Sequence, residues 1–191
     1  MTRVVSPLCR WLLKIGVSAN LLSALGGLGA SVSAIAFFTH GYYFWGMVVT
    51  LFFILFDLLD GTLARMSESG GSTWGALLDS TLDRISDAAV LGSVAYYLMK
   101  SNDRLVPVFI VALVTGGLVS YIKARAEGLG IECNGGFAER TDRLIIIFVA
   151  LGFAGLGVPY ILAVGAWILA LASVYTIFER LAIVYRATSN A

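Results

Sequence analysis

The stretch IGVSANLLSALGGLGASVSAIAFFTHGYYFWGMVVTLFFILF, residues 15–56, contains no Asp, Glu, Lys or Arg. Its 42 residues are about twice the ~20 that an α-helix needs to cross the apolar layer of a bilayer. The polar break Thr39-His40-Gly41 lies near the middle and indicates a turn. This stretch therefore predicts two membrane-spanning helices that run in opposite directions.

The rest of the chain repeats this pattern. A second charge-free run, residues 144–178, is interrupted by GLGVP at 155–159 and predicts two more helices. Residues 75–99 and 105–125 lie between the two runs, and each is long enough to cross a bilayer. We therefore expect an all-α integral membrane protein with about six transmembrane helices.

The composition of the chain agrees with this expectation. Of its 191 residues, 59% are apolar and 13% are charged, and the mean hydropathy is +0.88. An ordinary soluble domain has about 25% charged residues, so a water-soluble globule is excluded. The net charge of +1 gives no reason to expect a nucleic-acid partner. We expect a single membrane domain over residues 1–191, with a six-helix core at 17–186.

The basic residues predict how the helices are oriented. Six spans place both termini on one side of the membrane, and this side carries ten of the basic residues: Arg3, Arg10, Lys14, Arg65, Lys123, Arg125, Arg140, Arg143, Arg180 and Arg186. Only Lys100 and Arg104 lie on the other side. Because cytoplasmic loops are enriched in Lys and Arg, we expect cytoplasmic termini in a multi-pass protein of the cell (plasma) membrane.

The segment before the first span carries its own pattern. In residues 1–16, the basic residues Arg3, Arg10 and Lys14 recur at a spacing that stacks them on one helical face. This spacing predicts an amphipathic helix lying in the membrane interface. The alternative is that these residues are ordinary basic anchors beside a span.

Aspartates end one predicted span and begin the next. Asp57 and Asp60 lie at the inner end of the second span, and Asp79, Asp83 and Asp87 lie in the first turns of the third. Ionisable groups in spans are expensive and usually functional. The two spans run in opposite directions through a short cytoplasmic loop, so both groups are expected at one depth, near the cytoplasmic face.

So many carboxylates at one place repel one another unless protons or cations neutralise them. No Lys or Arg matches them one for one, although Arg84 is able to pair with Asp87 along the third span. Carboxylate oxygens from two helices suit Mg²⁺, Mn²⁺ or Ca²⁺, and two such ions would suit a displacement at phosphorus. The alternatives are an ionic network that only ties helices together, and an ion-coupled membrane carrier. The lack of inverted repeats and the shallow depth of the carboxylates count against the carrier.

The aspartates belong to a longer pattern. Residues 57–83 read DLLDGTLARMSESGGSTWGALLDSTLD, which contains D-x2-D-G-x2-A-R followed by G-x3-D-x3-D. This pattern resembles the signature of the CDP-alcohol phosphotransferase family, membrane enzymes of phospholipid synthesis. Between Arg65 and Gly75 the chain has one residue more than the family usually has, which blurs the alignment of the loop.

The resemblance implies a set of roles. It implies two Mg²⁺ ions, with Mn²⁺ as an alternative. One ion is held by Asp57, Asp60 and Asp79, and the other is held by Asp57, Asp79 and Asp83. It implies that Asp83 is also the catalytic base toward the acceptor hydroxyl. The residues that it places against the CDP-diacylglycerol donor are Asn20, Leu21, Leu22, Ser23, Gly61, Arg65 and Ser72. It further implies a homodimer among membrane lipids.

A second polar group favours an acceptor that carries phosphate. Helix geometry places Lys123, Arg140, Arg143 and Arg180 at the same depth as the aspartates, and a cationic pocket there suits a phosphate. The alternative is that these residues are ordinary basic anchors at the membrane surface, which need no ligand. The segment SYIKARAEGLGIECNGGFAERTDRL, residues 120–144, resembles that of bacterial phosphatidylinositol phosphate synthases. This resemblance implies inositol 1-phosphate as the acceptor, with phosphatidylinositol phosphate and CMP as products. The implied acceptor-phosphate residues are Ser120, Lys123, Arg140, Arg143 and Arg180. The competing acceptor is glycerol 3-phosphate, used by phosphatidylglycerophosphate synthases.

Overall fold

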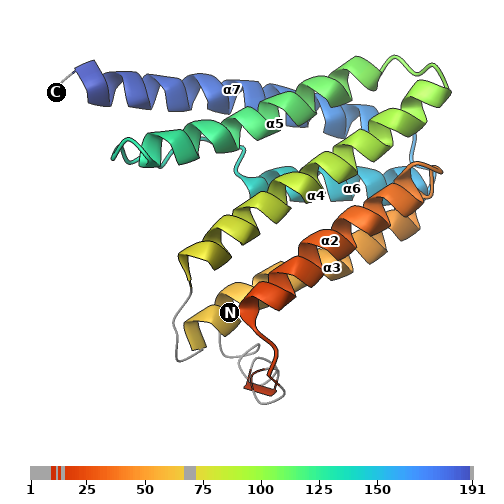
Figure 1. Cartoon of the computed structure of the whole chain (residues 1–191). Helices are drawn as coiled ribbons and strands as arrows, with labels where there is room; N and C mark the ends of the chain where they lie inside the picture. Colours follow the sequence, from red (N-terminus) through yellow and green to blue (C-terminus); the bar gives the residue numbers. More distant parts are fainter. Residues whose placement is uncertain (1–9, 12, 14–15, 67–71, 190–191) are drawn as a thin grey trace.

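The computed structural model describes residues 10–11, 13, 16–66 and 72–189, including all of their side chains except those at 57, 58, 60, 61, 64 and 65. These residues form six α-helices and no strand, which confirms the all-α prediction for the described part of the chain (Figure 1). The helices are α2 (Ala19–Phe38), α3 (Tyr43–Met66), α4 (Thr73–Lys100), α5 (Val106–Glu127), α6 (Arg140–Gly155) and α7 (Ile161–Ser189). The interfacial helix predicted over residues 1–16 falls largely outside the described residues.

Three of the helices, α2, α5 and α7, are long and apolar enough to cross a membrane. In α3 the apolar part is the shorter segment Tyr43–Phe56, and α6 has only 16 residues. The chain is therefore a helical membrane protein with three spans supported by length and composition.

The helices end where the sequence predicts breaks. Gly41 has a φ of +78° in the turn between α2 and α3, and Gly157 has a φ of +86° between α6 and α7. Glycine adopts this backbone conformation without the steric cost of a side chain. At the start of α2, the Ser18 Oγ accepts a hydrogen bond of 3.2 Å from the Leu21 amide and caps the helix.

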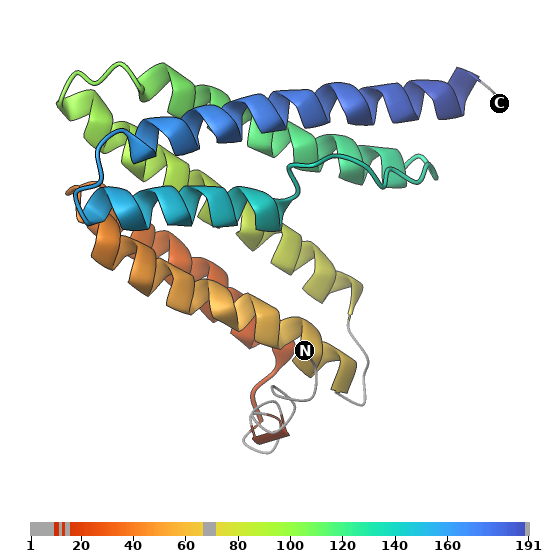
Figure 2. The same ribbon diagram turned by 180° about the vertical axis from the view of Figure 1, so that it is seen from behind.

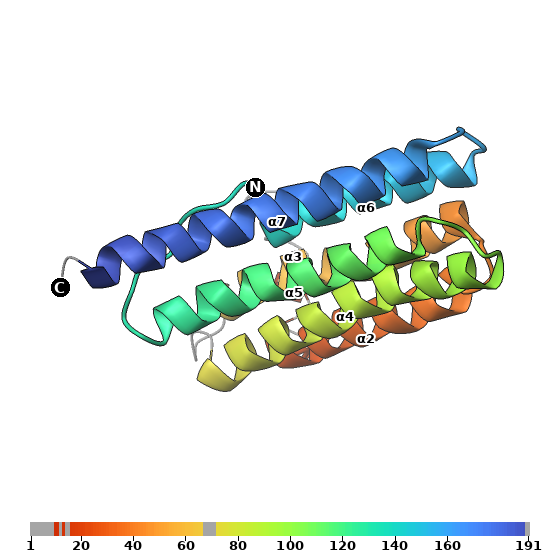
Figure 3. The ribbon, with the colours of Figure 1, turned by 90° about the horizontal axis from the view of Figure 1, so that it is seen from above.

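The six helices close into a ring. Each contacts its neighbour in the order α2, α3, α6, α7, α5, α4 and back to α2. The turns after α2, α4 and α6 lie at one end of the bundle, and the end of α3, the start of α4 and the link after α5 lie at the other (Figures 1 and 2). Seen from above, α6 and α7 lie on one side of the bundle, and α2 and α4 lie on the opposite side (Figure 3).

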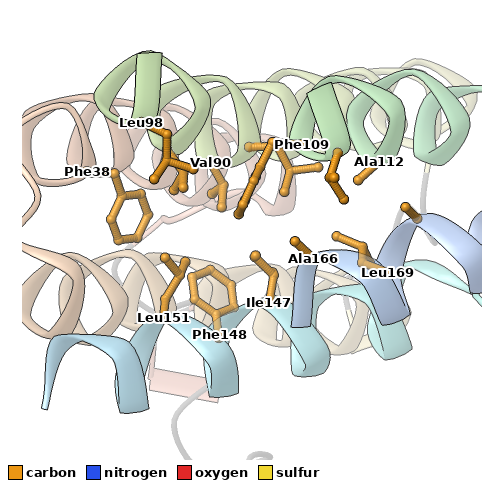
Figure 4. Close-up of a cluster of buried hydrophobic side chains, with 14 of the residues drawn as sticks. Phe38, Val90, Leu98, Phe109, Ala112, Ile147, Phe148, Leu151, Ala166 and Leu169 are labelled. Atoms are coloured by element: carbon orange, nitrogen blue, oxygen red, sulfur yellow. The ribbon is translucent and has the colours of Figure 1, made fainter. Parts of the chain in front are cut away.

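The core fills the middle of this ring. Phe38, Val90 and Phe109 face Phe148 and Leu151 across the interior (Figure 4). These side chains come from α2, α4, α5 and α6, so one apolar cluster ties together helices from both sides of the bundle. This packing sets how these helices lie against one another.

Candidate active site

The predicted metal-binding aspartates lie at one end of the bundle. Asp57 and Asp60 lie in the last turns of α3, and Asp79 and Asp83 lie in the first turns of α4, at the same end (Figures 1 and 2). The side chains of Asp57 and Asp60 are outside the described set. No group of three potential metal ligands occurs among the described residues. The four-aspartate metal site therefore stays a prediction.

Arginines of α4 and α6 pair with the carboxylates of α4. The Arg140 Nη1 lies 2.8 Å from the Asp83 Oδ1, and the Arg140 Nε lies 3.4 Å from the Asp87 Oδ1. The Arg143 Nη2 lies 3.2 Å from the other Asp87 oxygen. The first turn of α6 is thus joined to α4 by ion pairs.

These pairs correct one expectation. The sequence allowed Arg84 to pair with Asp87, but its Nη2 lies 3.5 Å from the Asp83 Oδ2 instead. The physical reason is that α6 brings two guanidinium groups to Asp87, so its carboxylate oxygens already have partners. The Arg84 Nε is buried and has no hydrogen-bond partner among the described residues.

A polar cavity of about 260 Å³ lies beside Arg140, the residue that pairs with Asp83. The structure brings all five predicted acceptor-phosphate residues to this cavity: Ser120, Lys123, Arg140, Arg143 and Arg180. Arg84, Glu127 and Glu139 also line it, so its walls come from α4, α5, α6, α7 and the segment before α6. We call this cavity the cationic pocket.

Two arginines of the cationic pocket are held firmly. Arg143 is 6% exposed, and besides Asp87 it donates a hydrogen bond of 3.0 Å to the carbonyl oxygen of Ala138. Gly116 of α5 faces Arg143, since a Cβ built on it would lie 3.4 Å from the Arg143 Nε. Arg180 is 2% exposed and donates to two backbone carbonyl oxygens. Fixed guanidinium groups are suited to binding a phosphate with little loss of side-chain freedom.

The predicted donor-binding residues come together in part. Asn20 of α2 lies against Gly75 of α4, because a Cβ on Gly75 would come within 2.6 Å of the Asn20 Oδ1. The Ser72 Oγ accepts a hydrogen bond of 2.9 Å from the Gly75 amide and caps α4. The starts of α2 and α4 therefore meet at the glycine of the aspartate signature.

The structure describes the other residues predicted to bind CDP-diacylglycerol only in part. In the first turns of α2, Leu22 and Ser23 are buried whereas Leu21 is exposed. The Ser23 Oγ donates a hydrogen bond of 3.1 Å to the Ala19 carbonyl oxygen. Gly61 and Arg65 lie in α3, and their side-chain positions are outside the described set. Contact of these residues with a nucleotide stays a prediction.

Sequence reasoning did not include Glu139 and Asp87 in the site. Glu139 pairs with Lys123 and Arg180, and Asp87 pairs with two arginines. Segment 139–143 reads ERTDR and has as many acidic as basic residues, so charge counting along the sequence gave no signal that Asp87 would pair with these arginines.

Comparison with known proteins gives a consistent result. Residues 16–178 match the family model described as CDP-alcohol phosphatidyltransferase. The chain is 41% identical over 182 residues to a Corynebacterium glutamicum phosphatidylinositol phosphate synthase, covering 93% of this chain and 82% of the relative.

Solved structures of a Mycobacterium tuberculosis phosphatidylinositol phosphate synthase share the fold. The crystal structure with CDP-DAG bound has a TM-score of 0.90 and 41% identity, and the match covers 96% of this chain and 94% of that chain. The complex of that synthase with manganese and citrate has a TM-score of 0.89, with 41% identity, 95% coverage of this chain and 88% of that chain.

Proposed function

Because the chain belongs to the CDP-alcohol phosphatidyltransferase family, we propose that it transfers the phosphatidyl group of CDP-diacylglycerol to a hydroxyl of inositol 1-phosphate. The products are phosphatidylinositol phosphate and CMP. The observation that carries the choice of acceptor is the cationic pocket, where Lys123 and the guanidinium groups of Arg140, Arg143 and Arg180 line one cavity. A phosphate monoester supplies the countercharge that these side chains favour.

The metal-binding residues are proposed to be Asp57, Asp60, Asp79 and Asp83. Their carboxylate oxygens are the hard ligands that Mg²⁺ and Mn²⁺ prefer, and a relative has been crystallised with manganese. We propose two Mg²⁺ ions, which would offset the negative charge of the diphosphate when bound. The residues present fit this role because the aspartates lie in the last turns of α3 and the first turns of α4, two helices that are consecutive along the chain.

The proton and bond changes balance around Asp83. The acceptor hydroxyl oxygen attacks the lipid-side phosphorus of CDP-diacylglycerol, its proton passes to the Asp83 carboxylate, and the phosphorus–oxygen bond to CMP breaks. The 2.8 Å contact with Arg140 supports this assignment, because it places Asp83 beside the pocket in which the acceptor would bind.

The donor nucleotide would lie where α2 and α4 begin and α3 ends. The residues proposed to contact it are Asn20, Leu21, Leu22, Ser23, Gly61, Arg65 and Ser72. The approach of Asn20 to Gly75 supports this arrangement, because it joins α2 to the aspartate signature. The acyl chains of the donor would stay in the bilayer while the nucleotide lies at its surface.

The membrane arrangement follows from the basic residues. We place all six helices across the cell membrane, with the termini and the active site on the cytoplasmic side, and residues 1–16 in the interface. The whole chain, residues 1–191, forms one membrane domain in this proposal, and two copies form a homodimer. Lys100 and Arg104 lie near the opposite end of the bundle, beside the turn between α4 and α5.

The experiment that tests this function measures CMP release by the purified protein with CDP-diacylglycerol and Mg²⁺. The acceptor panel contains inositol 1-phosphate, glycerol 3-phosphate, inositol and serine. We expect turnover with inositol 1-phosphate, and we expect Lys123→Gln to raise its KM without changing the KM for CDP-diacylglycerol. Lys100→Gln, at the other end of the bundle, is the matched control. Faster turnover with glycerol 3-phosphate or free inositol would contradict the proposed acceptor.

A further inference from the structure

A carboxylate lies inside the cationic pocket. Glu139, the residue before α6, places one oxygen, Oε1, 3.6 Å from the Lys123 Nζ and 3.5 Å from the Arg180 Nη2. A single anionic oxygen is thus shared by two of the cations that the proposed function assigns to the acceptor phosphate. A phosphate that binds both cations competes with this oxygen.

The two partners of Glu139 differ in their freedom to move. The Arg180 Nε donates a hydrogen bond of 2.8 Å to the Gly135 carbonyl oxygen, and its Nη1 donates one of 2.7 Å to the Val119 carbonyl oxygen. These bonds fix the guanidinium group and direct Nη2 toward Glu139. The Glu139 side chain is 54% exposed. The carboxylate is therefore the member of the pair that moves when an anion arrives.

A phosphate is the stronger ligand for these cations. A phosphate monoester carries up to two negative charges and three oxygens, whereas the carboxylate carries one charge and shares one oxygen between Lys123 and Arg180. Charge-assisted hydrogen bonds to phosphate can engage both cations at once. A neutral polyol offers no such compensation and leaves the ion pairs of Glu139 in place.

The product of the proposed transfer must also be able to leave the cationic pocket. In the proposed transfer, the acceptor reacts through a hydroxyl, so its phosphate passes unchanged into the product. The product therefore leaves the enzyme still carrying the group that binds the cationic pocket. A pocket of fixed cations with no anion of its own would hold this product tightly.

From these observations, and resting on the proposed function, we propose that Glu139 is an exchangeable counter-ion of the cationic pocket. The phosphate of the acceptor displaces the Glu139 carboxylate on binding, and the carboxylate returns to Lys123 and Arg180 as the product leaves. This exchange weakens the hold of the pocket on the phosphate and so speeds product release.

The test compares Glu139→Gln with Glu132→Gln, which makes the same change at an exposed glutamate of the same loop. Inorganic phosphate serves as the probe, as a competitive inhibitor against inositol 1-phosphate. In Glu139→Gln, the inhibition constant of phosphate and the KM for inositol 1-phosphate should both fall by roughly 3- to 10-fold, as expected for loss of partly exposed ion pairs. Steady-state kcat should also fall, while the single-turnover rate stays at the wild-type value.

Glu139→Asp is the second variant, because it keeps a charged residue that favours the helix start but shortens the reach of the carboxylate. It should lower the phosphate inhibition constant in the same direction. An unchanged or raised inhibition constant in both variants would overturn the proposal. A raised KM for inositol 1-phosphate alone would also overturn it, because this result would mean that Glu139 binds the hydroxyls of the acceptor.

Failure of the proposed function has a different signature. If Lys123→Gln leaves both the phosphate inhibition constant and the KM for inositol 1-phosphate unchanged, then the cationic pocket does not bind the acceptor, and the role of Glu139 falls with it. If Lys123→Gln raises both values while the Glu139 variants do not lower them, then the pocket stands and the role of Glu139 is wrong.

Discussion

The Arg140 Nη1 lies 2.8 Å from the Asp83 Oδ1, so one guanidinium group joins the cationic pocket to the aspartate signature. Arg140 lines the pocket, whereas Asp83 belongs to the four residues proposed to bind metal. The same guanidinium group also contacts Asp87. Arg140 therefore interacts with a proposed metal ligand as well as with the proposed acceptor site.

This relationship predicts that Arg140 and Arg143 differ in their effect on metal binding. Arg140→Gln should tighten Mn²⁺ binding by roughly 2- to 5-fold, because it removes a cation that competes for an oxygen of Asp83. Arg143→Gln should leave Mn²⁺ binding unchanged, because Arg143 contacts Asp87 and the Ala138 carbonyl oxygen instead. Titration of free Mn²⁺ by electron paramagnetic resonance checks both variants. Equal shifts in the two variants would contradict this separation.

Asp87 is predicted to position two arginines without contacting the substrates itself. Its two oxygens lie 3.4 Å from the Arg140 Nε and 3.2 Å from the Arg143 Nη2. Asp87→Asn should lower the free energy of unfolding by about 1–3 kcal/mol, because charged groups lose their partner. It should raise the KM for inositol 1-phosphate several-fold and leave the KM for CDP-diacylglycerol unchanged.

Steady-state kinetics with each substrate varied in turn checks the prediction for Asp87. Asp87→Glu, which keeps the charge, should restore most of the affinity for inositol 1-phosphate. If the two KM values rise together in Asp87→Asn, the residue supports the fold as a whole and does not specifically position the pocket.

Much of the fold could be predicted because the signals are local. The charge-free runs and the GLGVP break at 155–159 predict where helices start and end, and α6 does end at Gly155. Four of the acceptor-phosphate residues, Lys123, Arg140, Arg143 and Arg180, could be predicted to share a layer because helix ends on one side of a membrane lie at one depth, and the family resemblance added Ser120. The structure brings all of them to one cavity.

The ion pairs could not be predicted in the same way. Asp87 and Arg140 are 53 positions apart, and their contact depends on how α4 packs near α6 through the core. Arg180 was predicted to bind the acceptor phosphate, but its position in the sequence did not indicate that two of its nitrogens donate to backbone carbonyl oxygens. Such contacts depend on tertiary packing, which the spacing of residues along one helix does not encode.

Asp83 is predicted to act as the base of the transfer. Asp83→Asn should lower kcat by about 10²- to 10⁴-fold, the range for loss of general acid–base catalysis. Binding of CDP-diacylglycerol should persist, since Asp57, Asp60 and Asp79 remain. CMP release and a ligand-induced shift in unfolding temperature measure the two quantities separately. The matched control is Asp103→Asn at the other end of the bundle. Asparagine keeps the Oδ1 that accepts a hydrogen bond from the Leu105 amide.

Removal of divalent metal is predicted to stop the reaction without unfolding the protein. The apolar cluster around Phe109 and Leu151 holds the bundle together independently of the aspartates. A chelator should therefore abolish CMP release and leave the helical circular dichroism spectrum intact, and either Mg²⁺ or Mn²⁺ should restore turnover. Full turnover in the presence of excess chelator would contradict the metal-assisted reaction.

The loop between α5 and α6 is predicted to control the pocket through Gly136. This residue has a φ of +106°, and a Cβ on it would collide with the Thr176 methyl group of α7. Next to it, the Gly135 carbonyl oxygen accepts the hydrogen bond that fixes Arg180. Gly136→Ala should therefore cost about 1–3 kcal/mol of stability from backbone strain alone, with the collision adding to it.

Gly130 provides the matched control, because it has a φ of +75° in the same loop and nothing lies within 4 Å of its Cβ position. Gly130→Ala should cost only about 1–2 kcal/mol. Because only Gly136→Ala moves the segment that holds Arg180, only this variant should also raise the KM for inositol 1-phosphate. Unfolding temperature in detergent and acceptor kinetics check the pair, and equal KM values in the two variants would show that the loop does not position Arg180.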